Sequence, residues 1–200
     1  MKSPLRYQIT EYDCGSVSLL NCLTFLFERE EIPAELVRVI SVYALDCYDT
    51  KGKLSTVGNN REIVYYVSRW INEFAEQKNI PVYCKYLRGA DSTFLKIRAC
   101  LKAGGCVSMK TYHGDEHYVT LTAIDDEYVY LFDPYFKAAE DYRNNKYIEY
   151  IAGMPFSFNR RVRLEYFLSE KRNEFSMGPI EKREALLFRR NDALLEHSFS

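Results

Sequence analysis

Residues 8–27 read QITEYDCGSVSLLNCLTFLF, a polar segment that gives way to a largely apolar one. The apolar half predicts a mostly buried helix that begins at Cys14. Asp13 stands just before the first turn and is a favourable N-cap, because its carboxylate can accept hydrogen bonds from the unpaired N–H groups there. Cys14 is thus expected at a helix N-terminus, whose partial positive charge favours a thiolate over a thiol.

A predicted β-hairpin farther along the chain brings a histidine and an aspartate together. The runs 117–124 and 128–132 are rich in Val, Tyr, Thr and Ile, and a short acidic turn separates them. Counting back from the turn sets His117 opposite residue 134 or 135, within about two residues of Asp133. The Asp133 carboxylate is therefore expected to reach the imidazole of His117.

These residues fit the triad logic of thiol hydrolases. A carboxylate on one ring nitrogen fixes the imidazole tautomer and leaves the other nitrogen to take a proton from sulfur. We therefore assign Cys14 as nucleophile, His117 as general base and Asp133 as the residue that orients the base. Gln8, six residues before Cys14, is a candidate donor to the oxyanion of a tetrahedral intermediate, together with the Cys14 N–H. Each residue taken alone would more often be structural, so the hypothesis depends on the combination.

The same motifs resemble a known family. They are Gln8, Asp13-Cys14-Gly15 followed by a hydrophobic helix, His117-Tyr118-Val119, and Asp133-Pro134 sixteen residues after the histidine. This conjunction spans about residues 5–136 and is similar to the papain-fold peptidases that remove double-glycine leader peptides from bacteriocins, here as a stand-alone relative. The resemblance implies a papain-like fold and hydrolysis of a peptide or amide bond, often after small residues such as a Gly-Gly pair.

The rest of the chain predicts an α+β fold in which N-terminal helices pack on an antiparallel sheet. Proline near the first helical position and apolar residues at three- and four-residue spacing predict helices. The expected helices lie at 33–43, from Asn60 through an apolar stripe at 63–74, and from residue 91 or 92 to 101; the other expected strands lie at 81–87 and 106–112. Residues 46–60 are expected to form a surface loop. In the charged C-terminal extension, 159–200, we expect a helix near 161–171, a short strand near 185–188 and no second hydrophobic core.

Length and composition restrict the class of protein. Two hundred residues suit one domain, 1–200, and a net charge of -1 gives no reason to expect nucleic acid as a partner. The N-terminus has no apolar run fit for a signal peptide, and no segment approaches the length of a membrane span, so we expect a cytoplasmic protein without a span. The six cysteines lack the paired CxxC spacings of a zinc site, and a chain without an export signal usually keeps its thiols reduced, so we expect no metal, no disulfide and no cofactor. The expected partner is a peptide or amide substrate.

Three alternatives to hydrolysis stay open. The acyl-enzyme could pass its acyl group to an amine, which would make the protein a transferase or ligase. The fold could instead serve as a peptide-binding module with an inactive site. His113 and His117 stand four residues apart, a spacing that binds metal on a helix, but they are expected on a turn and a strand with no third ligand, which disfavours a metal site.

Overall fold

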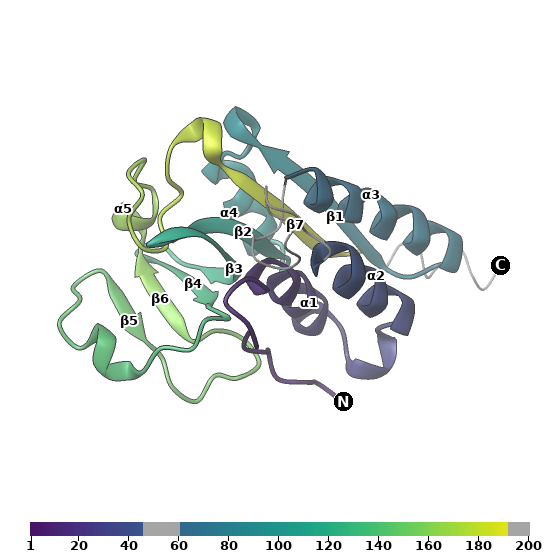
Figure 1. The fold of residues 1–200 in the computed structure, drawn as a ribbon, viewed down its shortest axis with the longest axis horizontal. Helices are drawn as coiled ribbons and strands as arrows, with labels where there is room; N and C mark the ends of the chain where they lie inside the picture. The colour runs from purple at the N-terminus through teal and green to yellow at the C-terminus, as the bar shows by residue number, and fades with distance from the viewer. Residues whose placement is uncertain (46–60, 192–200) are drawn as a thin grey trace, which may run out of the picture.

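Seven strands form one antiparallel sheet in the computed structural model, which describes residues 1–45 and 61–191. The strands are β1 (Val82–Arg88), β2 (Cys106–His113), β3 (Asp115–Ile124), β4 (Tyr128–Phe132), β5 (Ile148–Tyr150), β6 (Arg160–Arg163) and β7 (Glu184–Arg190). Their order across the sheet is β1-β7-β2-β3-β4-β6-β5 (Figure 1). The predicted strands are confirmed, and the C-terminal strand β7 lies inside the sheet, between β1 and β2.

Helices cover both faces of this sheet. They are α1 (Cys14–Leu26), α2 (Ala34–Leu45), α3 (Arg61–Lys78), α4 (Phe94–Lys102) and the single turn α5 (Leu164–Phe167), with 3-10 turns at Arg29–Glu31, Gly89–Asp91, Ala139–Tyr142 and Ile180–Lys182. Helices α1 to α3 pack on one face and α4 on the other. The predicted α+β class, with N-terminal helices on an antiparallel sheet, is confirmed. Helix α4 starts later than expected, because the Thr93 side chain caps it by accepting from the Lys96 N–H.

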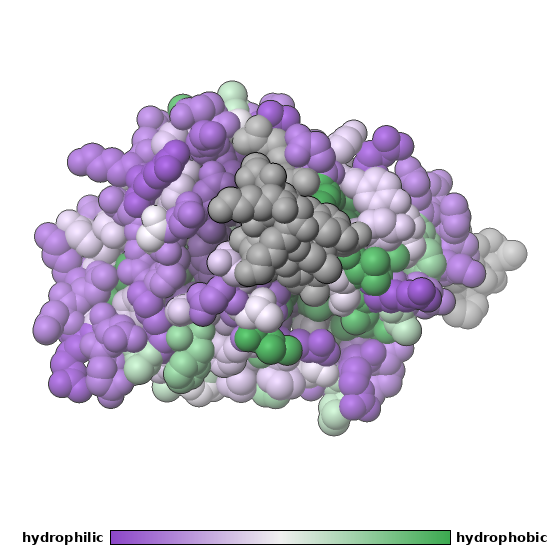
Figure 2. Space-filling view, viewed as in Figure 1, coloured by the Kyte–Doolittle hydropathy of each residue, from purple (hydrophilic) through white to green (hydrophobic). Residues whose placement is uncertain are grey.

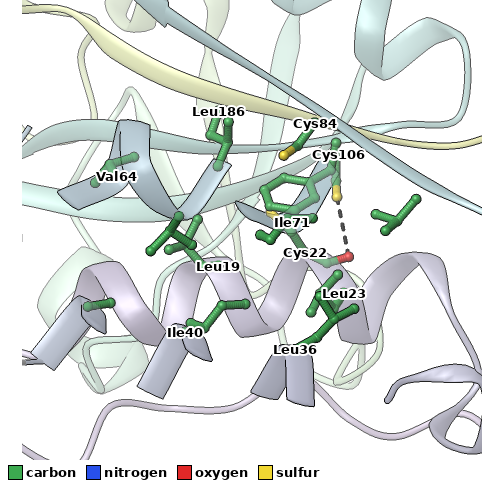
Figure 3. Packing of buried hydrophobic residues seen from close by; sticks show 14 of the residues in the cluster. Leu19, Cys22, Leu23, Leu36, Ile40, Val64, Ile71, Cys84, Cys106 and Leu186 are labelled. Carbon is green, nitrogen blue, oxygen red and sulfur yellow. Dashed lines mark hydrogen bonds between the residues drawn. The ribbon is translucent and has the colours of Figure 1, made fainter. Parts of the chain in front are cut away.

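The core beneath α1 joins three helices to the sheet. Figure 3 shows Leu19, Cys22 and Leu23 of α1 packed among Leu36 and Ile40 of α2, Val64 and Ile71 of α3, and Cys84, Cys106 and Leu186 of the strands. The predicted apolar stripe of α3 is therefore core. Full burial of each such Leu or Ile contributes about 1.5–3 kcal/mol, so this contact fixes α1 firmly on the sheet.

Buried hydroxyl groups set the position of α1 over two strands. The Ser18 hydroxyl lies 2.9 Å from the Ser108 hydroxyl of β2 and 3.1 Å from the Thr120 hydroxyl of β3. Thr120 also donates to the Ser18 carbonyl at 3.2 Å. Because an unpaired buried hydroxyl is costly, the helix is held where all three groups find partners. Ser18 lies one turn after Cys14, so these bonds also locate the start of the helix.

The predicted helix near 161–171 is wrong. Residues 160–163 form β6, in which Arg160 and Val162 are buried and Arg163 is exposed. Only the turn α5 follows. This alternation of burial is typical of a strand, because successive side chains of a strand point to opposite faces.

The C-terminal extension also contributes to a second hydrophobic cluster, so the expectation of no second core there is wrong. Its Val162, Phe167 and Phe175 are fully buried, together with Ile148 of β5, against strand residues on the face opposite α1. These apolar residues are widely spaced among charged ones, so no helical or strand period signals them. The extension is therefore built into the fold.

The surface drawn in Figure 2 is largely hydrophilic over the end that carries β5 and α5, with smaller apolar patches beside α2 and the N-terminal segment. None of the helices in the described part of the chain has the length and apolar character needed to cross a membrane. The predicted surface loop at 46–60 and the cap at Asn60 lie outside the described residues.

Candidate active site

Cys14 is the first residue of α1 and is buried, with 6% of its surface exposed. The first hydrogen bond of the helix runs from the Val17 N–H to the Asp13 carbonyl at 3.0 Å. The N–H of Cys14 consequently has no acceptor within the helix. A free N–H beside the sulfur can donate to an oxyanion that forms on a carbonyl attacked there.

Asp13 does not cap α1 with its side chain, contrary to the prediction. Its carboxylate turns to the preceding loop and accepts hydrogen bonds from the Ile9 N–H and from both the N–H and the hydroxyl of Thr10, each at 3.0 Å. Local donors of this kind compete with those of the helix for a short acidic side chain. The result is a fixed loop between Gln8 and Cys14.

Gln8 lies in this loop, next to the aspartate of the predicted triad. Its N–H donates to the Pro134 carbonyl at 2.9 Å, and its side-chain amide donates to the Thr10 carbonyl at 2.7 Å. Its side-chain oxygen is buried and makes no hydrogen bond to a described residue. An amide nitrogen carries two hydrogens, and the bond to Thr10 uses one of them.

His117 and Asp133 meet as predicted. The Nε2 atom of His117 lies 2.7 Å from Oδ1 of Asp133, and both side chains are buried. Thr120 pairs with Phe132 in the β3–β4 ladder, and this register sets His117 opposite Tyr135. The count that set His117 opposite residue 134 or 135 implies that Ile124 pairs with residue 127 or 128. Ile124 pairs instead with Val129, one to two residues farther along. A bulge between Leu121 and Ala123 restores the predicted register before the strand reaches His117.

Asp133 is held by residues that sequence analysis missed. Its Oδ1 also accepts from the Tyr135 N–H at 2.9 Å. The Asn159 side chain bonds the Asp133 N–H and carbonyl, each at 2.8 Å. The guanidinium of Arg160 lies 4.0 Å from Oδ2, and both groups are fully buried. Because Asn159 and Arg160 stand in a segment that reads as solvated and charged, no pattern in the sequence marks these two residues as part of the site.

The surroundings of His117 favour the imidazolium. Burial of the ring opposes protonation, but the hydrogen bond to Asp133, the contact with the Cys14 thiol and the negative charges of both groups outweigh it. Together they raise the pKa of His117 to about 10. Among the described residues, Asp133 is the one that the ring meets at hydrogen-bond distance. The Cys14 sulfur lies close enough to contribute to the raised pKa. With Nε2 bonded to Asp133, Nδ1 is the nitrogen left for the sulfur.

The other described cysteines differ from Cys14. Cys22, Cys84, Cys100 and Cys106 are free thiols buried in the two clusters. Burial raises the pKa of Cys22 and Cys84 well above the usual range and that of Cys100 to about 12. The thiols of Cys22, Cys84 and Cys100 therefore stay protonated at neutral pH.

His113 belongs to a different set of contacts. Its Nδ1 lies 2.9 Å from Glu174, and its ring centre is 5.6 Å from that of His117. Lys137 shares the same Glu174 oxygen at 3.1 Å. Among residues 1–45 and 61–191, no group of three or more His, Cys, Asp or Glu side chains is placed to hold a metal ion.

No protein-family model matches the sequence, and no curated protein matches it. Two solved structures are similar to the chain. A double-glycine motif protease from an AMS/PCAT transporter, in complex with the leader peptide, is 15% identical, with 94% of this chain and 91% of that chain covered and a TM-score of 0.46. A protein described as a C39-like peptidase from Bacillus anthracis is 15% identical, with 94% and 95% covered and a TM-score of 0.49. At this level the likeness says nothing of activity.

Proposed function

We propose that the protein is a cysteine peptidase that cleaves a peptide or amide bond with the triad Cys14, His117 and Asp133. The observation that supports it most is the short bond between the buried pair His117 and Asp133, which leaves the other ring nitrogen to Cys14 at the start of α1. A thiol, an imidazole and a carboxylate arranged in this way suit nucleophilic catalysis, and here the thiol stands about a hundred residues before the other two groups in the sequence.

The proposed reaction has two stages. The Cys14 thiolate attacks the scissile carbonyl, and the oxyanion accepts hydrogen bonds from the Cys14 N–H and the Gln8 amide. The His117 imidazolium then gives its proton to the leaving amine as the C–N bond breaks, which leaves a thioester on sulfur. The neutral imidazole takes a proton from water, the hydroxide attacks the thioester, and the product acid leaves as the thiolate–imidazolium pair is restored.

The whole chain is proposed to work as one domain. Strand β7 lies between β1 and β2, and Asn159 is bonded to Asp133. Both contacts tie the C-terminal extension to the part of the chain that carries the motifs.

Mass spectrometry of peptides tests the proposal directly. Peptides with and without a Gly-Gly pair, incubated with the wild-type protein, should yield fragments cut after the small residues. Cys14→Ala should yield none, because no other described thiol lies beside His117. Fragments formed equally by Cys14→Ala would exclude Cys14 as the nucleophile, and binding without any cleavage would favour the peptide-binding module.

A transferase uses the same acyl-enzyme. Repeating the incubation with a competing amine separates the two outcomes, since a hydrolase releases the acid and a ligase accumulates the amide. The fully buried Asp133 and the buried Cys14 are compatible with hydrolysis and with transfer to an amine. The ratio of acid to amide products therefore distinguishes the two reactions.

Replacing Gln8 with alanine should lower turnover by about 10²- to 10³-fold, because one oxyanion donor is typically worth that much. The fold should persist, since the backbone bond of Gln8 to Pro134 does not involve the side chain. Gln77→Ala, at an exposed position of α3, is the matched control and should keep full activity. Full activity of Gln8→Ala would remove this residue from the site.

A further inference from the structure

Arg160 is a fully buried charge next to the proposed triad. Its Nη2 lies 4.0 Å from Oδ2 of Asp133, and neither side chain has exposed surface. Its Nη1 donates to the Asn159 carbonyl at 2.9 Å and its Nη2 to the Lys137 carbonyl at 3.4 Å. Asp133 Oδ2 and Arg160 Nε have no hydrogen bond to a described residue. The two side chains therefore lie within ion-pair range of each other without a direct hydrogen bond.

Aromatic rings hold the guanidinium in place. Its central carbon lies 4.7 Å from the ring centre of Tyr142 and 4.7 Å from that of Tyr150. Ring faces attract a cation but cannot neutralise it. A buried charge is costly without a counter-charge, and Asp133 is the carboxylate within ion-pair range of Arg160.

The other charges nearby are already compensated among themselves. Glu174 accepts from Tyr142 at 3.1 Å, from Lys137 at 3.1 Å and pairs with His113 at 2.9 Å. Burial opposes ionisation of Glu174, but the contacts with His113 and Lys137 outweigh it and lower the pKa of Glu174 to about 2, so it remains a carboxylate that is balanced by Lys137. Among the described residues, Arg160 is thus the cation that can balance Asp133.

The charge balance of the site follows from these pairs. A thiolate on Cys14 and an imidazolium on His117 cancel, and the Asp133 carboxylate leaves the triad with one net negative charge. Arg160 brings the buried group to neutrality. Given the proposed function, on which this inference depends, we propose that Arg160 is a positioning residue that balances the charge of Asp133 and so keeps the thiolate–imidazolium pair intact at mildly acid pH.

Loss of the arginine should make the site bind a proton more strongly. Without Arg160 the buried group carries an uncompensated negative charge, and a thiolate is intrinsically a stronger base than a carboxylate, so proton uptake at the sulfur should occur at higher pH. The shift should be about one pH unit, the order expected for one charge acting over roughly 10 Å at an effective dielectric constant near 20.

The experiment is the pH profile of Cys14 alkylation by iodoacetamide, which needs no substrate. The acid limb of the profile should move up by about one unit in Arg160→Met, and Arg160→Lys, which keeps the charge, should restore most of the wild-type position. Arg161→Met is the matched control: this neighbour pairs with Glu149 at 2.6 Å and is 34% exposed. Its profile should equal that of the wild type.

Asp133→Asn/Arg160→Met provides a second comparison if Arg160→Met does not fold. The double variant has no uncompensated buried charge, and such paired replacements are often tolerated. It should fold, with an acid limb near that of the wild type. An acid limb about one unit above that of the wild type, or failure of both variants to fold, would overturn charge compensation.

The outcomes for the two proposals can be told apart. A wild-type protein without preferential labelling of Cys14 at mildly acid pH would contradict the proposed peptidase site itself. Preferential labelling that is unchanged in Arg160→Met would leave the peptidase proposal standing and reject the role of Arg160.

Discussion

Replacing His117 with alanine should abolish turnover, with a loss of about 10⁴-fold or more. The side chain holds the proton that the leaving amine requires, and its raised pKa of about 10 keeps that proton bound at neutral pH. Alanine removes the proton donor and also the partner of the buried Asp133 carboxylate. Initial rates of cleavage of the peptide identified by mass spectrometry measure the loss, and thermal unfolding checks that the variant is folded.

His113→Ala is the matched control for this prediction. His113 lies on the same hairpin but is bonded to Glu174, and not to Asp133. Its loss should change turnover by less than roughly tenfold, since one residue outside the reacting groups contributes little to the barrier. Equal loss in both variants, with recovery on addition of zinc, would favour a metal site at these histidines.

The sequence predicted the elements whose apolar residues form a regular pattern. The apolar run after Cys14 predicted α1, and the stripe at 63–74 predicted α3, because burial of one helix face leaves a regular trace. The approach of His117 to Asp133 followed from hairpin geometry alone. That prediction succeeded despite an error at the turn, since the bulge between Leu121 and Ala123 changes the register by one residue.

Sequence analysis failed where a residue's role depends on contacts distant in sequence. Arg160 reads as one of two surface arginines, yet it is fully buried while Arg161 is partly exposed. The pairing of β6 with β4 sets Arg160 opposite Leu131, two residues before Asp133, and so brings the guanidinium to the Asp133 carboxylate.

The predicted cap at Asp13 was wrong because of contacts that are close in sequence. Aspartate is generally favoured at this position before a helix, but donors in the preceding loop bind its carboxylate. A single-residue preference of about 1 kcal/mol is easily outweighed by three hydrogen bonds.

Cys14 should be the most reactive of the described thiols toward iodoacetamide at pH about 5.5. An ordinary thiol is about one part in a thousand thiolate at that pH. Burial raises the pKa of Cys22, Cys84 and Cys100, which makes their thiolate fractions smaller still. Cys14 instead lies beside an imidazolium and at a helix N-terminus, and both favour the thiolate. Limited alkylation followed by peptide mapping should place most of the label on Cys14.

The role of the imidazolium can be separated from that of the helix by the variant His117→Ala. If the ion pair sustains the thiolate, labelling of Cys14 at pH about 5.5 should fall at least tenfold in this variant, whereas labelling at pH about 9, where an ordinary thiol ionises, should change little. Unchanged labelling at acid pH would assign the activation to the helix N-terminus alone. Label spread evenly over the cysteines of the folded wild-type protein, or a Cys14 that is never labelled, would contradict an activated nucleophile and favour a peptide-binding module.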